Sequence, residues 1–65
     1  MKILIRNYRK RKGMSIVELA EKADLSKSTI SNIENGIVSP NMIQMENLAK
    51  SLEVKITDLF ESDFK

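Results

Sequence analysis

A run of short polar and cationic side chains between residues 27 and 35 is the part of this sequence best suited to recognise a partner. The run consists of Lys27, Ser28, Ser31, Asn32 and Asn35. In the major groove of DNA, lysine donates hydrogen bonds to guanine, and asparagine can bond adenine through two of them. Ile30 and Ile33 would hold a helix of this sequence to its protein by one edge and leave the polar side chains facing outward. The same pattern also fits the ordinary polar surface of a small helical bundle.

The basic residues of the chain are concentrated at its start. Residues 1–12 contain six of the eleven basic residues and no acidic residue, whereas the rest of the chain is net acidic. A concentrated basic stripe is what a polyanionic partner would use, and a solvated helix face has the same composition.

Length and composition exclude several classes of function. The chain has 65 residues with no cysteine and no histidine, so it lacks a disulfide frame, the usual zinc ligands and nucleophile–histidine pairs. Its longest apolar run, Ile3-Leu4-Ile5, is too short for a membrane span or a signal peptide. We therefore expect one intracellular, non-enzymatic binding domain over residues 1–65, with no cofactor, no metal and no small-molecule ligand.

Glycine, proline and helical spacing of apolar residues divide the chain into short helices. The expected helices cover about residues 3–12, 15–23, 26–35, 41–52 and 57–60. Ser15 with Glu18, and Asn41 with Gln44, are expected to cap two of them. No β-sheet is expected, so the fold class is all-α, a compact five-helix bundle.

The second and third of these helices are joined by about three residues and form a helix-turn-helix unit over about residues 15–35. Ala20 is small enough for the second helix of the unit to cross the first closely. Gly13 is expected to end the first helix of the chain in a left-handed conformation, and Asp24 tolerates that conformation at the turn. Ser26 then caps the outward-facing helix.

Several motifs keep a spacing that is typical of one family. The stretch Ser-Thr-Ile-Ser-x-Ile-Glu-Asn-Gly at residues 28–36 is specific, and Glu-Leu-Ala at 18–20, Gly13 and Pro40 stand at matching distances from it. On these residues, nearly the whole chain resembles the Cro/repressor-type (XRE) helix-turn-helix domains. The resemblance implies a lambda-repressor-like DNA-binding domain of bacterial or phage transcription factors, which usually binds near-palindromic operators as a dimer.

The resemblance also implies roles for individual residues of the outward-facing helix. Lys27, Ser28 and Asn32 occupy the main base-reading positions, and Ser31 is a secondary candidate. These roles match the hydrogen-bonding capacity that the side chains have on their own.

Other matching positions imply phosphate contacts and a structural ion pair. Asn35 and the backbone of Gly36 match a loop that grips phosphate, and Ser15 matches a helix N-terminus whose free N–H groups suit an anion. Arg9 and Glu34 match a pair that ties the first helix to the end of the third.

Two departures from the family pattern weaken the expected DNA face. Ile16 stands where glutamine is common, so a phosphate contact there comes from backbone N–H groups or is lost, unless the side chain touches a thymine methyl group. The loop over residues 37–39 carries no basic residue, which predicts fewer phosphate contacts and a shallower salt dependence. The basic cluster of Arg6, Lys10, Arg11 and Lys12 is expected to compensate only where it lies beside the DNA backbone, and Lys10 and Arg11 are its expected phosphate contacts.

More apolar residues are present than the surface of a small monomer needs. The candidates for a dimer contact, which incidental exposure explains equally well, are Ile37, Val38, Ile43 and Phe64. The residues expected to complete the core are Met14, Met42, Met45, Ile56 and Phe60.

These observations predict a sequence-specific DNA-binding transcriptional regulator, in particular a repressor. It is expected in the cytoplasm of a bacterium or its phage, away from membranes, where it binds double-stranded DNA as a homodimer that is weak in solution and completed on DNA. The alternative is a protein-interaction module, antitoxin-like or an anti-repressor partner, that retains the fold with a weakened DNA face. Ile16, Val17 and the neutral loop favour this alternative.

Overall fold

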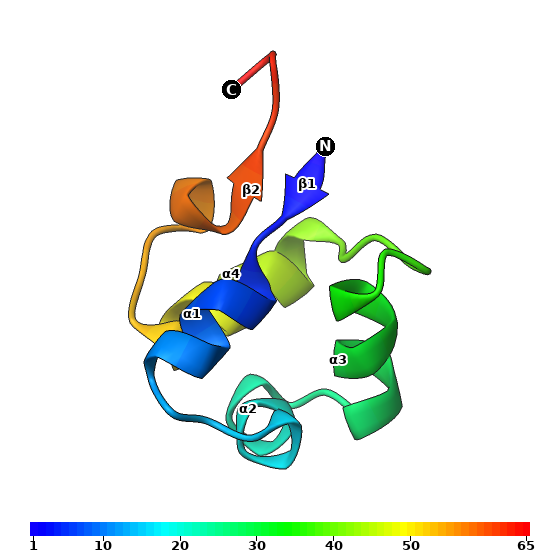
Figure 1. Ribbon diagram of the computed structural model, residues 1–65, viewed down its shortest axis with the longest axis vertical. Coiled ribbons are helices and arrows are strands. Elements are labelled where there is room, and N and C mark those ends of the chain that lie inside the picture. Colours follow the sequence, from blue (N-terminus) through cyan, green and yellow to red (C-terminus); the bar gives the residue numbers. More distant parts are fainter.

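The computed structural model describes all 65 residues. Its elements in chain order are β1 (Lys2–Ile3), α1 (Ile5–Arg11), α2 (Ile16–Ala23), α3 (Lys27–Glu34), α4 (Met42–Leu52), the 3-10 turn η1 (Ile56–Leu59) and β2 (Phe60–Glu61). Figure 1 shows α1 and α4 in the middle, α2 below them, α3 to their right and both chain ends at the top.

Short polar side chains fix the starts of α2, α3 and α4. The Ser15 hydroxyl accepts from the Glu18 N–H (3.1 Å), and the Glu18 carboxylate accepts from the Ser15 N–H (3.2 Å). Asn41 and Gln44 form the same reciprocal pair at 2.7 and 3.0 Å. Ser26 accepts one N–H bond of 3.0 Å at the start of α3. These bonds satisfy N–H groups that a helix start leaves free, and all three predicted caps are confirmed.

All four α-helices end in the same way, at a residue with left-handed backbone. These residues are Gly13, Asp24, Gly36 and Glu53, with φ of +69°, +56°, +74° and +58°. In each case the next N–H donates to a carbonyl five positions earlier, which is the Schellman motif. The expectations for Gly13 and Asp24 are confirmed. Glu53 was not expected, because a glutamate rarely adopts this conformation.

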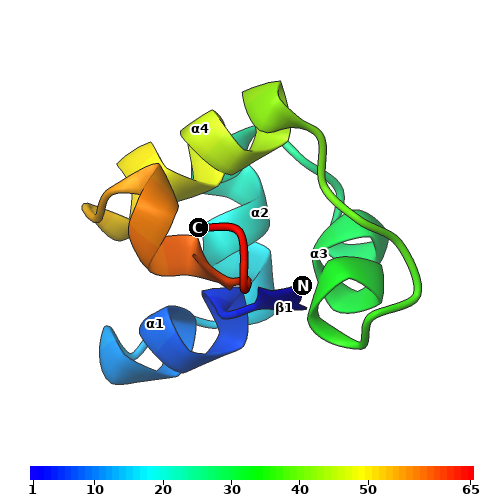
Figure 2. The same cartoon turned by 90° about the horizontal axis from the view of Figure 1, so that it is seen from above.

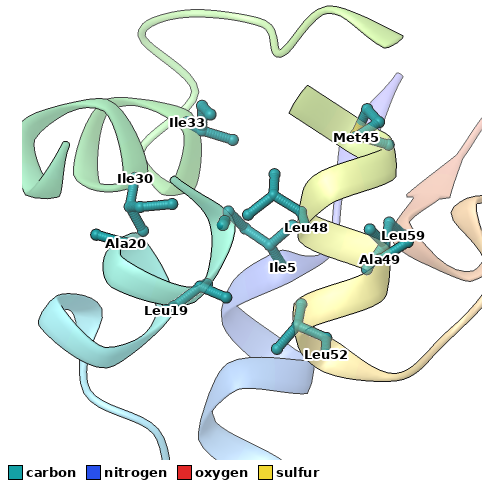
Figure 3. Packing of buried hydrophobic residues seen from close by; sticks show 11 residues of the cluster. Ile5, Leu19, Ala20, Ile30, Ile33, Met45, Leu48, Ala49, Leu52 and Leu59 are labelled. Atoms are coloured by element: carbon teal, nitrogen blue, oxygen red, sulfur yellow. The ribbon is translucent and has the colours of Figure 1, made fainter. Parts of the chain in front are cut away.

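The core lies where α2, α4 and the start of α1 meet. Its fully buried large side chains are Ile5, Leu19, Ile30, Ile33, Leu48, Leu52 and Leu59. They point toward one another in Figure 3, where Ala20 lies beside Ile30 at the crossing of α2 and α3. The main helix contact of α3 is with α2, so α3 is attached to the bundle by one edge.

Two expectations about the ends of the chain are wrong. Strands β1 and β2 pair antiparallel, with Lys2 opposite Glu61 and Ile3 opposite Phe60, so the fold contains a small sheet and α1 begins two residues later than predicted. The fifth helix is the 3-10 turn η1, so the bundle has four α-helices and not five. Two-residue strands are too short to show an alternating pattern, and their pairing joins opposite ends of the chain.

All but one of the residues expected to complete the core do so. Met45 is buried, and Met14, Ile56 and Phe60 are half-buried against the core. Met42 is 68% exposed, which contradicts the expectation. It is the first residue of α4 and lines an open groove instead of the packed interior. No helix in the structure is both long and apolar enough to cross a bilayer.

Candidate nucleic-acid interface

Helix α3 stands at the edge of the molecule in both ribbon views, with the α3–α4 loop outside it (Figures 1 and 2). Ile30 and Ile33 are buried against the bundle. Lys27 and Ser28 are exposed, while Ser31 and Asn32 are half-buried. The structure therefore gathers the four predicted base-reading residues on one outward helix, of which Lys27 and Ser28 protrude furthest.

A single guanidinium connects the two ends of the helix-turn-helix unit to α1. Arg9 donates to both carboxylate oxygens of Glu34, from Nε at 2.7 Å and from Nη2 at 3.0 Å. Its Nη1 donates to the carbonyl of Met14 (2.9 Å), which directly precedes the cap of α2. The predicted pairing of Arg9 with Glu34 is thus present, and it also fixes the start of α2 relative to the end of α3.

Arg6 is a second partner of Glu34 that the sequence reasoning missed. Its Nε donates to Glu34 Oε1 (3.1 Å), and its Nη2 donates to Asn35 Oδ1 (2.7 Å). The Glu34 side chain is 1% exposed, against 11% for Arg9 and 45% for Arg6. The available signal was helical spacing, because residues three apart share a helix face and Arg6 lies one turn before Arg9.

The two arginines decide the charge state of Glu34. Burial by itself raises the pKa of this carboxyl, because it disfavours the charged form. Hydrogen bonds from Arg9 and Arg6, with their positive charges, outweigh burial, so the pKa of Glu34 lies below its ordinary value of 4.5. The hydrogen bond to Glu34 raises the pKa of Arg9 against the effect of burial. The cluster of Arg6, Arg9 and Glu34 therefore carries one net positive charge at neutral pH.

The lowered pKa of Glu34 predicts a component of acid sensitivity. The unfolded state binds a proton more readily than the folded state, so this stabilisation is complete above about pH 5 and is lost as the pH falls through the folded pKa. We expect the melting temperature of the wild type to fall more steeply between about pH 5 and pH 3 than that of Glu34→Gln, which has no carboxyl to titrate. Melts followed by circular dichroism measure both slopes. Parallel slopes would contradict the expected linkage.

The start of α2 offers free backbone donors. Ser15 is exposed, and its hydroxyl oxygen accepts the Glu18 N–H, which leaves the hydroxyl hydrogen available. The N–H groups of Ile16 and Val17 make no hydrogen bond within the chain. The Ile16 side chain packs partly against the core, and Val17 is the more exposed of the two.

The loop after α3 differs in detail from the expectation. The Gly36 N–H already donates to the carbonyl of Ile33 (3.2 Å), and the Ile37 N–H donates to Asn32 (2.9 Å). What Gly36 offers is close approach of the backbone, since a side chain added there would point into open space. The first backbone N–H after Gly36 that makes no hydrogen bond within the chain is that of Ser39, which was not predicted as a phosphate contact.

The predicted phosphate-binding residues of α1 differ in their surroundings. Lys10 is exposed and makes no ion pair, and it lies one turn after Arg6 on the same side of the helix. The Arg11 guanidinium stacks over the ring of Tyr8, 5.0 Å from its centre. Lys10 is therefore the freer of the two cations.

All four candidates for a dimer contact are exposed. Ile37 and Val38 lie in the α3–α4 loop, Ile43 lies in the first turn of α4, and Phe64 lies in the last residues of the chain. Met42 is exposed as well and lines an open groove of about 240 Å³. The other groove-lining residues are Met1, Ile3, Ser39, Pro40, Met45, Ile56 and Phe60.

Known proteins are similar to this chain in sequence and in fold. A family model described as helix-turn-helix matches residues 5–59. The HTH-type transcriptional regulator SlrR of Bacillus subtilis is 43% identical over 61 residues, which are 92% of this chain and 40% of SlrR. SinR of the same organism is 40% identical over 58 residues, which are 88% of this chain and 52% of SinR. The chain thus spans about half the length of these regulators, or less.

Solved structures of SinR match over most of the chain. The N-terminal DNA binding domain of SinR from Bacillus subtilis is similar with a TM-score of 0.82 at 37% identity, over 94% of this chain and 90% of that domain. A crystal structure of SinR in complex with DNA is similar with a TM-score of 0.83 at 40% identity, over 88% of this chain and 92% of that one.

Proposed function

Because the chain belongs to the XRE-type helix-turn-helix family, we propose that it regulates transcription by binding a specific DNA sequence. We propose further that it is a repressor and that it acts as a homodimer. In this proposal α3 lies in the major groove of a near-palindromic operator. Lys27, Ser28 and Asn32 read base edges, with Ser31 in a secondary role. No single residue of the chain is proposed to do covalent chemistry.

One observation carries this proposal more than any other. Arg9 binds Glu34 at the end of α3 and the Met14 carbonyl at the start of α2 with the same guanidinium. The two regions proposed to bind phosphate, at Ser15 and at Asn35–Gly36, are therefore held at fixed positions relative to each other and to α3. Contacts to phosphates on both sides of a groove set the position of a helix within it, and base contacts then supply specificity.

Selection of bound duplexes from a random library, followed by sequencing, tests the proposal directly. The expected result is an enriched motif with two-fold symmetry. Enrichment of no motif, together with no gel shift of random duplex at low salt, would contradict DNA binding.

The residues proposed to read bases and those proposed to bind phosphate predict different losses. Asn32→Ala is expected to weaken binding to the selected duplex by about 1–3 kcal/mol, with loss of preference at one position, because a base-edge partner is removed. Lys10→Ala is expected to weaken binding to every sequence and to lower the salt slope by about one. Titrations on selected and scrambled duplexes at several salt concentrations measure both. Equal losses on the two duplexes for Asn32→Ala would rule out base reading by this residue.

A protein-interaction module is the second candidate function. The half-buried Ile16, the absence of a basic residue in the α3–α4 loop and the exposed Ile37, Met42 and Ile43 support it. In this case the gel shift fails, and the apolar surface binds a protein instead.

A further inference from the structure

Arg6 contacts both the buried ion pair and the end of α3. Its Nε donates to Glu34 Oε1 (3.1 Å), and its Nη2 donates to Asn35 Oδ1 (2.7 Å). Glu34 already receives two hydrogen bonds from Arg9, so its charge has a full partner without Arg6. The distinct contribution of Arg6 is therefore its short bond to Asn35, which is strengthened by the charge of the donor.

This bond limits what Asn35 can present to a partner. A free asparagine amide can turn either its oxygen or its nitrogen outward. Here Oδ1 accepts from Arg6, which turns the oxygen toward α1, and Nδ2 donates to Ser31 Oγ (3.4 Å) with its second hydrogen unpaired. The amide is thus held with its donor side available.

We propose that Arg6 is a positioning residue of the DNA interface, which orients the Asn35 amide so that its nitrogen is the group presented to a partner. The inference rests on the function proposed above. An amide that presents its N–H group suits a phosphate oxygen, whereas the two-bond pair with adenine needs the amide oxygen as well, which here faces Arg6. Asn32 makes no side-chain hydrogen bond within the chain and keeps both capacities. The two asparagines of this surface therefore have different roles, although the residue type is the same.

The geometry of arginine is needed for this role. Nε and Nη2 belong to one planar group and reach two acceptors on neighbouring residues at once, whereas the ammonium of lysine is a single point of charge. Arg6→Lys therefore keeps the charge and loses the orientation of Asn35. The Arg6 side chain is 45% exposed and the Arg9–Glu34 pair does not depend on it, so we expect this variant to keep the fold.

A double-mutant cycle measures the coupling. The proteins are wild type, Arg6→Lys, Asn35→Ala and the double variant, titrated on the duplex that the wild type selects. We expect Arg6→Lys to weaken binding about fivefold, or roughly 1 kcal/mol, with an unchanged salt slope and with no further loss in the Asn35→Ala background. The control is Lys12→Arg, the reverse exchange in the exposed ion pair with Glu53 (3.4 Å), which is expected to leave binding unchanged.

A second measurement needs no DNA. Relaxation of the Asn35 side-chain amide by nitrogen-15 NMR is expected to report a rigid group in the wild type and a mobile group in Arg6→Lys. An amide that is equally mobile in both proteins overturns the inference, whatever the protein binds. If the wild type binds DNA and Arg6→Lys binds it equally well, only the inference fails. A wild type that binds no duplex overturns the proposed function together with the inference.

Discussion

The Glu34→Ala variant is expected to lose about 3 kcal/mol of stability and to melt about 15 °C below the wild type. The substitution removes an acceptor that receives two hydrogen bonds from Arg9 and one from Arg6. Arg9 then keeps only its hydrogen bond to the Met14 carbonyl, although its side chain is just 11% exposed. A cation that is nearly buried and has lost its counter-charge is the costly product of breaking such a pair.

Thermal and urea unfolding of the same variant would measure the loss. Glu46→Ala is the matched control, because Glu46 is an exposed helical glutamate without an ion pair, and its removal is expected to change stability by less than about 0.5 kcal/mol. A melting temperature for Glu34→Ala close to that of Glu46→Ala would show that the cluster is an ordinary surface contact.

A palindromic duplex is expected to bind at least about 100-fold more tightly than an isolated half-site. One recognition helix reads only a few base pairs, which is too little to select one operator among ~10⁶ competing sites. Two copies related by a two-fold axis would place their α3 helices about 34 Å apart, one turn of duplex. In the proposed dimer, Ile37 and Ile43 of the first copy would contact the second copy, so that binding of one copy would favour binding of the other at the adjacent half-site.

Sedimentation of the protein with each duplex, alongside titrations, tests this expectation. A palindrome with about five additional base pairs between its halves is the control, because it turns the half-sites to opposite faces of the duplex and should abolish the gain. The double variant Ile37→Ser/Ile43→Ser should bind the half-site normally and also lose the gain. Tight one-to-one binding to the half-site with no improvement on the palindrome would contradict the dimer.

The features that could be predicted from the sequence are those that depend on a few neighbouring residues. Ser15 and Glu18 are three residues apart, and their reciprocal bonds need only the local chain to become helical. Asp24 ends α2 in the left-handed conformation that its short polar side chain tolerates. The outward face of α3 followed from the spacing of its buried residues alone.

The features that were missed depend on contacts between distant parts of the chain. Neither β1 nor β2 has a pattern of its own, and each exists because the other lies beside it. Met42 has the spacing of a core residue, but it lines an open groove between α4 and the two ends of the chain and stays exposed. Arg6 belongs to the candidate site because the end of α3 lies beside α1, which the composition of the basic stripe does not reveal.

The pairing of β1 with β2 brings residues near the two ends of the chain side by side. Lys2 lies opposite Glu61, so a short flexible connection could join the two ends without moving a helix (Figure 1). Circular permutation is tolerated where the old ends are adjacent and the new ones fall in an exposed turn. The turn at Gly13 is such a place, because it is exposed and nothing lies within 4 Å of a side chain added there. A permuted chain that starts at this turn would carry the helix-turn-helix unit first and α1 last. Arg6 and Arg9 of α1 would then contact the unit from the opposite end of the sequence.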